Sequence, residues 1–287
     1  MARPPTGKEN EMTDVLIEKR PDGVALITLN RPESLNAMGG RLIPMLGEYL
    51  AECESDRGVR SIAITGAGRA FCAGGDVKGM QARNEGGSGD GERPRDNFAA
   101  AFEVLVRDLR AAQDAVSLKL HTIGKPTVAL VNGHAVGAGM SVALACDLRI
   151  CSDRAKFGTA FRNVGLSGDF GGSYFLQRLV GAGVARELYF TGEILDATRA
   201  LELGIANRVV PGERLMEEGL AFCAKLAQGP TATYARMKAN LNLAESSTLK
   251  ELLDQEAMLM RLSGMSSDSR EAVRAFVEKR EPRFIGE

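Results

Sequence analysis

Residues 66–80 of the chain read GAGRAFCAGGDVKGM, and residues 131–147 read VNGHAVGAGMSVALACD. Each stretch follows a run of apolar, largely β-branched residues, at 60–65 and 127–131, that predicts a buried strand. Small residues let a ligand approach the backbone closely, and a turn that leads into a helix leaves amide N–H groups without partners. Two such turns side by side would form an oxyanion hole, although two merely tight strand-to-helix turns would read the same way.

The rest of the chain predicts an α/β core followed by helices. Further strands are expected at 24–29 and 148–151, and a helix at 41–54. Later, Asp196 is expected to cap a helix that ends at Gly204, and three more helical patterns follow a short strand. We therefore expect a flexible tail at 1–13, an α/β core at 14–210 and a helical region at 211–287.

One helix and one loop are expected between the second and third strands. Residues 84–96 are polar and glycine-rich, which is typical of a mobile surface loop. Apolar residues then recur at steps of three and four along one helical face, which we interpret as core: Phe98, Phe102, Leu105, Leu109, Ala112, Val116 and Leu120.

Composition excludes several classes of function. The 287 residues carry 36 basic and 37 acidic side chains, so no global field favours nucleic acid or an anionic membrane. The first 14 residues contain no apolar segment, which argues against a signal peptide. The apolar stretch at 135–146 is too short to span a membrane and predicts a buried helix, so we expect a cytoplasmic protein.

Common site motifs are also missing. No CxxC pair accompanies the five cysteines, and only His121 and His134 could supply imidazole, so neither a metal site nor a disulfide framework is expected. The cysteines are expected to be reduced core residues. The glycine-rich stretches lack the third residue of GxGxxG, no GxxxxGK[ST] occurs, and residues 165–169 miss GxSxG at the last position.

Four separated segments resemble the crotonase superfamily, which includes the enoyl-CoA hydratases and isomerases. They are residues 30–37, 66–80, 131–147 and 275–280, in the family's order and at fitting spacings. The resemblance implies a spiral of ββα units with a helical trimerisation region, assembled as a homotrimer or a hexamer. It also implies an acyl-CoA thioester substrate and no permanently bound cofactor, with coenzyme A entering as part of the substrate.

The resemblance assigns roles to individual residues. The amides of Ala73 and Ala138 would hold the thioester oxygen, and fixed donors of this kind stabilise the charge that develops there during proton abstraction. The residues that would shape the acyl-CoA channel or contact CoA are Ala37, Gly74, Gly75, Asp76 and, reaching a neighbouring subunit, Phe276 and Lys279.

The chain departs from a hydratase at two positions. The family's two catalytic glutamates fall on Ser141 and Phe161, and neither can act as a carboxylate base. Asp169 resembles the catalytic aspartate of ring-type isomerases and of a dehalogenase branch, although it would equally suit a helix cap. Ser141 could orient a ligand or bond back to its own helical turn.

These residues favour double-bond isomerisation, because one carboxylate can take a proton from one carbon and return it to another. Hydration with a different base, and an acyl-CoA-binding protein without activity, remain the alternatives. A nucleophilic Asp169 ranks third, after isomerisation and hydration, because the motif does not bring the matching His and Trp of the dehalogenase pattern and the chain contains no Trp.

Overall fold

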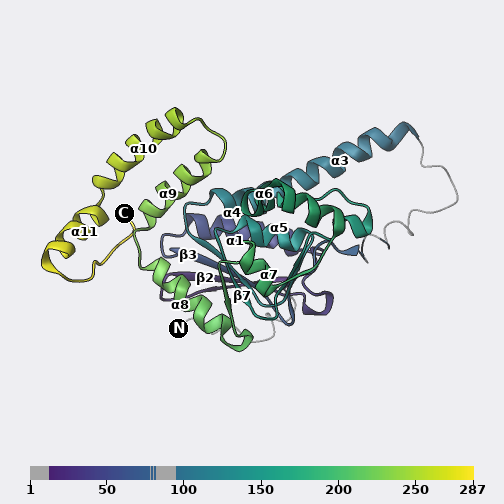
Figure 1. The fold of residues 1–287 in the computed structure, drawn as a ribbon, viewed down its shortest axis with the longest axis horizontal. Coiled ribbons are helices and arrows are strands. Elements are labelled where there is room, and N and C mark those ends of the chain that lie inside the picture. The colour runs from purple at the N-terminus through teal and green to yellow at the C-terminus, as the bar shows by residue number, and fades with distance from the viewer. Residues whose placement is uncertain (1–12, 78, 80, 82–94) are drawn as a thin grey trace, which may run out of the picture.

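A computed structural model of the chain describes residues 13–77, 79, 81 and 95–287. All but the last residue of the tail expected at 1–13 and most of the loop expected at 84–96 lie outside these residues. Figure 1 shows a layered α/β body with a group of helices at one end.

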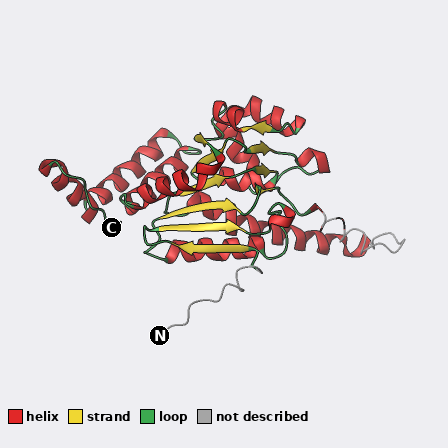
Figure 2. Ribbon diagram, turned by 90° about the horizontal axis from the view of Figure 1, so that it is seen from below, coloured by secondary structure: helices red, strands yellow, loops and turns green. Residues whose placement is uncertain are grey.

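The body is built on a six-stranded sheet in the order β1-β2-β3-β5-β7-β10. All neighbours pair in parallel except β1 and β2 (Figure 2). The strands predicted at 24–29 and 127–131 are confirmed, and the others lie within a residue or two of their predicted bounds where a prediction was made. The six strands are β1 (Val15–Lys19), β2 (Val24–Leu29), β3 (Ser61–Gly66), β5 (Thr127–Val131), β7 (Leu148–Ser152) and β10 (Arg208–Val210).

A second sheet has four short strands in the order β4-β6-β8-β9. The strands β4, β6 and β8 follow β3, β5 and β7 after short turns, so the chain passes from the large sheet into the small one three times. The strands have two or three residues each, too few to show a period of two in the sequence. They are β4 (Ala70–Cys72), β6 (His134–Val136), β8 (Lys156–Gly158) and β9 (Leu195–Asp196).

Helices cover both faces of the large sheet. Along β5, Ala129 and Val131 belong to one core, while Val128 and Leu130 belong to a second core against α8. This alternation follows from the two-residue period of a strand. The helices of the body are α1 (Leu42–Ser55), α4 (Lys119–Thr122), α5 (Ala138–Ala145), α6 (Gly172–Thr191), α7 (Ala197–Glu202) and α8 (Leu215–Ala227).

Three sequence predictions about this body are confirmed. Every residue of α5 is buried, as the apolar stretch at 135–146 indicated. Asp196 caps α7 by accepting a hydrogen bond from the Arg199 amide at 2.8 Å. All five cysteines are buried and free, in keeping with their expected role in packing.

The helix α3 (Arg95–Gln113) corrects the prediction of a continuous core stripe. It projects away from the sheets (Figure 1), and Phe102, Leu105 and Leu109 are 55%, 69% and 41% exposed. Only the continuation of the stripe, at Val116 and Leu120, is fully buried. An amphipathic pattern shows which face of a helix is apolar, but it does not show that the same chain buries that face.

The C-terminal arm consists of α9 (Thr231–Ala244), α10 (Leu249–Gly264) and α11 (Ser267–Glu278), which lie beside the body (Figure 1). No residue of α9 or α10 is fully buried. Arg60, next to β3, joins the arm to the body because its guanidinium donates to Gly229 O, Thr231 Oγ1 and Phe284 O.

The chain beyond α11 folds back onto the start of that helix. Asp268 is 2% exposed, and its carboxylate accepts the amides of Ile285 at 2.7 Å and Gly286 at 2.9 Å. The buried charge therefore has two backbone donors, as a buried carboxylate requires. Among the described residues, no helix combines the length and the apolarity needed to cross a membrane.

Candidate active site

The two glycine-rich turns meet where the chain passes from the large sheet to the small one. β4 pairs with β6, so the turn after Cys72 lies against the turn that begins α5. A Cβ atom built on Gly139 would lie 2.1 Å from Cys72 O, and one built on Gly74 would lie 3.5 Å from Ala138 N. Glycine at these positions allows the two backbones to touch.

Amides in the first turn differ in whether they are free to bind a ligand. Ala73 N–H donates to Leu35 O at 3.0 Å, and Gly74 N–H interacts with the Cys72 sulfur. Met38 N–H donates to Gly74 O, and this bond forms a β-bridge between Met38 and Gly75. The bond does not use the Gly75 amide, which has no acceptor among the described residues. Ala73, predicted as a donor, is therefore occupied, and the free amide is two residues further on.

The second turn presents the Ala138 amide. Gly137 N–H donates to Gly158 O at 2.8 Å, and α5 begins at Ala138. The first amides of a helix have no partner within the helix, and no acceptor for Ala138 N–H lies among the described residues. Each turn thus offers a donor without an acceptor among the described residues, Gly75 in the first turn and Ala138 in the second.

Asp169 lies in a turn with an unusual backbone. Gly168, Phe170 and Gly171 have φ angles of +105°, +49° and +76°. A left-handed φ is costly for a residue with a Cβ such as Phe170, and such residues cluster at functional sites. The turn leads into α6, where Asp169 O accepts the amide of Gly172 at 3.1 Å.

The Asp169 side chain does not cap this helix. The first residue before α6 is Gly171, with no side-chain hydrogen bond, and Asp169 Oδ1 is buried without a hydrogen-bond partner. Burial raises the pKa of the Asp169 carboxyl above its ordinary value of 3.8, because the charged form loses solvation. A carboxyl with no partner and a raised pKa is suited to accept and return a proton.

Phe161 places Asp169 close to the two free amides. Its Cε1 lies 3.7 Å from a Cβ built on Gly137, and its Cδ2 lies 3.6 Å from a Cβ built on Gly168. One aromatic ring therefore separates the turn before Ala138 from the turn before Asp169.

Two hydroxyl groups line the same region. A Cβ built on Gly172 would lie 2.3 Å from Ser141 Oγ and 2.8 Å from Tyr189 Oη, so both hydroxyls face the start of α6. Ser141 Oγ donates to Gly137 O at 3.3 Å, which confirms the bond back to its own turn. Tyr189 stacks on Phe161, and burial together with the nearby Asp169 charge raises the pKa of its phenol to about 12. Sequence reasoning missed Tyr189 because it lies deep in a helical pattern.

A hollow of about 470 Å³ opens next to the first turn. Met38, which is bridged to Gly75, forms part of its wall, as does Asp76. The Asp76 carboxylate accepts the amide of Gly79 at 2.9 Å and lies 3.8 Å from the Arg31 guanidinium. Arg31 also donates to Ala37 O at 2.8 Å. Arg31 thus links Ala37 to Asp76 beside this hollow.

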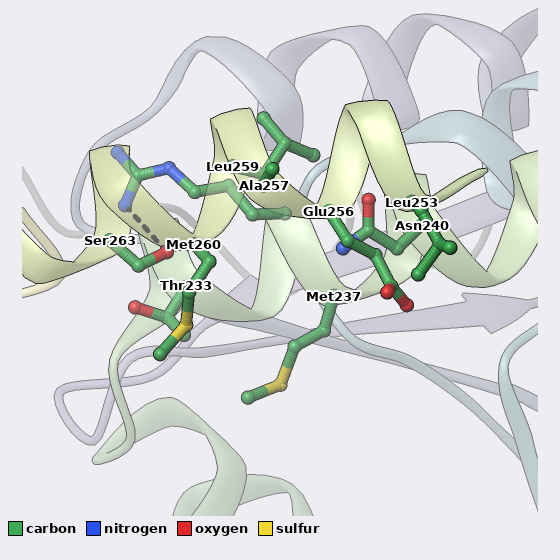
Figure 3. A pocket seen from close by; sticks show the side chains of 10 residues that line it. Thr233, Met237, Asn240, Leu253, Glu256, Ala257, Leu259, Met260 and Ser263 are labelled. Atoms are coloured by element: carbon green, nitrogen blue, oxygen red, sulfur yellow. Dashed lines mark hydrogen bonds between the residues drawn. The ribbon is translucent and has the colours of Figure 1, made fainter. Parts of the chain in front are cut away.

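Phe276 and Lys279 are not brought to this site within one chain. Phe276 is 85% exposed on α11, and Lys279 ends that helix with a left-handed φ of +53°. A second hollow, of about 530 Å³, lies between α9 and α10 and is lined by Met237, Leu253 and Met260 among others (Figure 3). It contains no part of the two glycine-rich turns.

Comparison with known proteins gives one consistent family. A family model described as enoyl-CoA hydratase/isomerase matches residues 19–287. The chain is 36% identical over 275 residues to the 1,2-epoxyphenylacetyl-CoA isomerase of Escherichia coli, covering 96% of this chain and all of that protein. It is 31% identical over 271 residues to the short-chain-enoyl-CoA hydratase of Clostridium acetobutylicum, covering 94% and 97%.

Solved structures agree with the sequence matches. The crystal structure of an enoyl-CoA hydratase from a Polaromonas species superposes with a TM-score of 0.84 at 31% identity, covering 94% of this chain and 99% of that one. A structure titled enoyl-CoA hydratase subunit I from Geobacillus kaustophilus gives 0.83 at 32% identity, covering 96% and all of that chain. The α/β architecture expected from the sequence is thereby confirmed as the crotonase fold.

Proposed function

The chain belongs to the enoyl-CoA hydratase/isomerase family, and we propose that it moves a double bond within an acyl-CoA thioester, with Asp169 as both base and acid. The observation that carries this proposal is the buried, unpartnered Oδ1 of Asp169, one ring away from the free amides. No other carboxylate of the described chain has both burial and a raised pKa at this place.

The reaction removes a proton from one carbon of the substrate and adds a proton to another. Asp169 removes a proton from the α-carbon of a 3-enoyl thioester. The electron pair of that C–H bond forms a double bond to the carbonyl carbon, and the carbonyl π pair moves onto the thioester oxygen. The amides of Gly75 and Ala138 donate to that oxygen, where a lost donor typically costs about 10²-fold to 10³-fold in rate. Asp169 then protonates the γ-carbon, and the dienolate collapses to the 2-enoyl thioester without any co-reactant.

Hydration is disfavoured by the two family positions that carry glutamate in hydratases. Ser141 Oγ is engaged with its own helix, and Phe161 offers an apolar ring. Water would therefore lack the second carboxylate that orients it. The isomerase of E. coli, at 36% identity, supports proton-transfer chemistry on an acyl-CoA, although its named substrate is an epoxide.

The test is deuterium incorporation from D₂O into a panel of enoyl-CoA thioesters, followed at the α and γ carbons by mass spectrometry. We expect exchange and double-bond migration by the wild type, and a loss of about 10²-fold to 10⁴-fold in Asp169→Asn. Asp108→Asn, at an exposed carboxylate of α3, is the matched control.

Other outcomes would point to the alternatives. Water addition that survives in Asp169→Asn would assign hydration to a different base. Thioester binding without exchange in either protein would favour an acyl-CoA-binding protein without activity.

The C-terminal arm supports a further proposal, that the chain assembles as a homotrimer or a hexamer through this arm. Its helices expose many large apolar side chains, and contiguous exposed apolar surfaces mark interfaces. The exposed residues include Leu241 at 70%, Met260 at 72%, Met265 at 74% and Phe276 at 85%. Assembly would also let Phe276 and Lys279 reach the CoA bound to a neighbouring chain.

A further inference from the structure

The turn that carries Asp169 needs an external support. Three of its residues have left-handed φ angles. This conformation costs free energy at Phe170, because Phe170 carries the Cβ atom that glycine lacks. The Phe170 side chain is 3% exposed, and the backbone amide beside it must also find a partner. That partner is Gln113, whose Oε1 accepts Phe170 N–H at 3.0 Å.

Gln113 comes from a distant part of the chain. It is the last residue of α3, 57 residues before Phe170, and it is half-buried. The next five residues, Asp114–Leu118, form a π-helical turn in which Val116 and Ser117 are buried. A π-turn inserts an extra residue into a helix and is frequent at functional sites.

The end of α3 also touches the other half of the site. Ala112, the neighbour of Gln113, lines the hollow of about 470 Å³ together with Met38 and Asp76. One helix end therefore contacts both the hollow beside the Gly75 amide and the turn that holds Asp169.

We propose that Gln113 is a positioning residue, which holds the Asp169 turn in the geometry for proton transfer through its hydrogen bond to Phe170 N–H. This inference rests on the proposed function of Asp169. An amide side chain suits the role because it accepts a hydrogen bond without bringing a charge to the unpaired carboxylate nearby. A glutamate at this position would accept the same bond but would repel the Asp169 carboxylate.

The charges around Asp169 make the difference between glutamine and glutamate at position 113 measurable. Tyr189, on α6, is the titratable group whose pKa responds to Asp169, and it stays neutral in the pH range of the assay because its pKa is about 12. The raised pKa of Asp169 is attributed to burial alone, with no contribution from a charged neighbour among the described residues. A new carboxylate at position 113 would therefore shift the pKa of Asp169 without an opposing charge among the described residues.

The experiment compares Gln113→Leu, which removes the acceptor, with Gln113→Glu, which keeps it and adds charge. Gln177→Glu, at an exposed position of α6, adds the same charge away from the site. Each protein is assayed for D₂O exchange across pH. The Phe170 amide shift and the Asp169 carboxyl titration are followed by NMR on selectively labelled protein.

We expect Gln113→Leu to lower kcat by about 10-fold to 100-fold with KM within about threefold, because small misplacement of a catalytic group is costly. Gln113→Glu is expected to move the acidic limb of the profile up by about one pH unit, and Gln177→Glu to leave it in place. If Gln113→Glu recovers kcat at high pH, the loss of kcat in Gln113→Leu reflects lost positioning and not general damage to the fold.

A kcat for Gln113→Leu within twofold of the wild type, or an unchanged Phe170 amide, would overturn the proposal. If exchange by the wild type proves independent of Asp169, the proposed function fails instead. The role of Gln113 is then decided by NMR alone: an Asp169 titration that Gln113→Glu does not move would refute it, and an upward shift would support it.

Discussion

The substitution Gly74→Ala tests whether the close approach of the two turns creates the pair of donors. A Cβ on Gly74 would lie 2.8 Å from Val136 O, about 0.6 Å short of an ordinary contact distance of 3.4 Å. The turns must separate by roughly this amount, and the Gly75 and Ala138 amides move with them. Alanine also enters the left-handed region at φ +94°, which costs about 1–2 kcal/mol.

From these displacements we expect the rate of deuterium exchange to fall by about 10²-fold, the lower end of the loss of one donor. The free energy of unfolding should fall by about 1–3 kcal/mol. The assay is exchange in D₂O at saturating thioester, with urea unfolding monitored in parallel.

Gly165→Ala is the matched control for backbone strain. Its φ is +68°, and nothing lies within 4 Å of the added Cβ. It should lose about 1 kcal/mol of stability and keep its exchange rate. If folded Gly74→Ala exchanges within about threefold of the wild type, the contact between the turns does not set the donor geometry, and the assignment of Gly75 and Ala138 is refuted.

Four further predictions follow from the carboxylates and the arm. Exchange should fall as pH drops through an Asp169 pKa above 3.8, because the base must be ionised; an acidic limb at an ordinary carboxyl pKa would contradict burial. The same raised pKa means that stability falls as pH rises through the range just above 3.8, so Asp169→Asn should raise Tm at pH 7, by about 2–4 °C per kcal/mol, in calorimetry. Asp268→Ala should lower the unfolding free energy by about 2–4 kcal/mol in urea, since the amides of Ile285 and Gly286 lose a buried acceptor. An effect below about 1 kcal/mol would show that the tail is not held there. Met260→Glu should shift sedimentation toward the monomer with the fold intact, whereas an unchanged assembly would place the interface elsewhere.

Sequence patterns located the long buried elements well. β2 and β5 are continuous β-branched runs bounded by turn residues, so their limits were visible without tertiary information. The helix cap at Asp196 was equally local. The second sheet and the exposure of α3 were not predictable, because both depend on which segments meet in space.

The candidate site shows the same division between features that local sequence predicts and features that depend on tertiary contacts. Glycine spacing indicated two turns with free amides, but the choice between Ala73 and Gly75 depends on a bond from Ala73 to Leu35, 38 residues earlier. The role proposed for Gln113 was hidden because a single polar residue beside an apolar stripe reads as a solvated position. Gln113 does not break the stripe, because Ala112 and Val116 keep the four-residue step on either side of it.

The three hydrogen bonds of Arg60 impose an order on folding during synthesis. Arg60 leaves the ribosome with β3, but one of its acceptors, Phe284 O, follows 224 residues later. Domains fold as they emerge, so the sheets can form while Arg60 still lacks this acceptor. The orientation of the C-terminal arm is therefore completed after the body, and its apolar surface becomes a defined shape only when nearly the whole chain has been made. The assembly proposed for this arm would then belong to the finished protein and not to the growing chain.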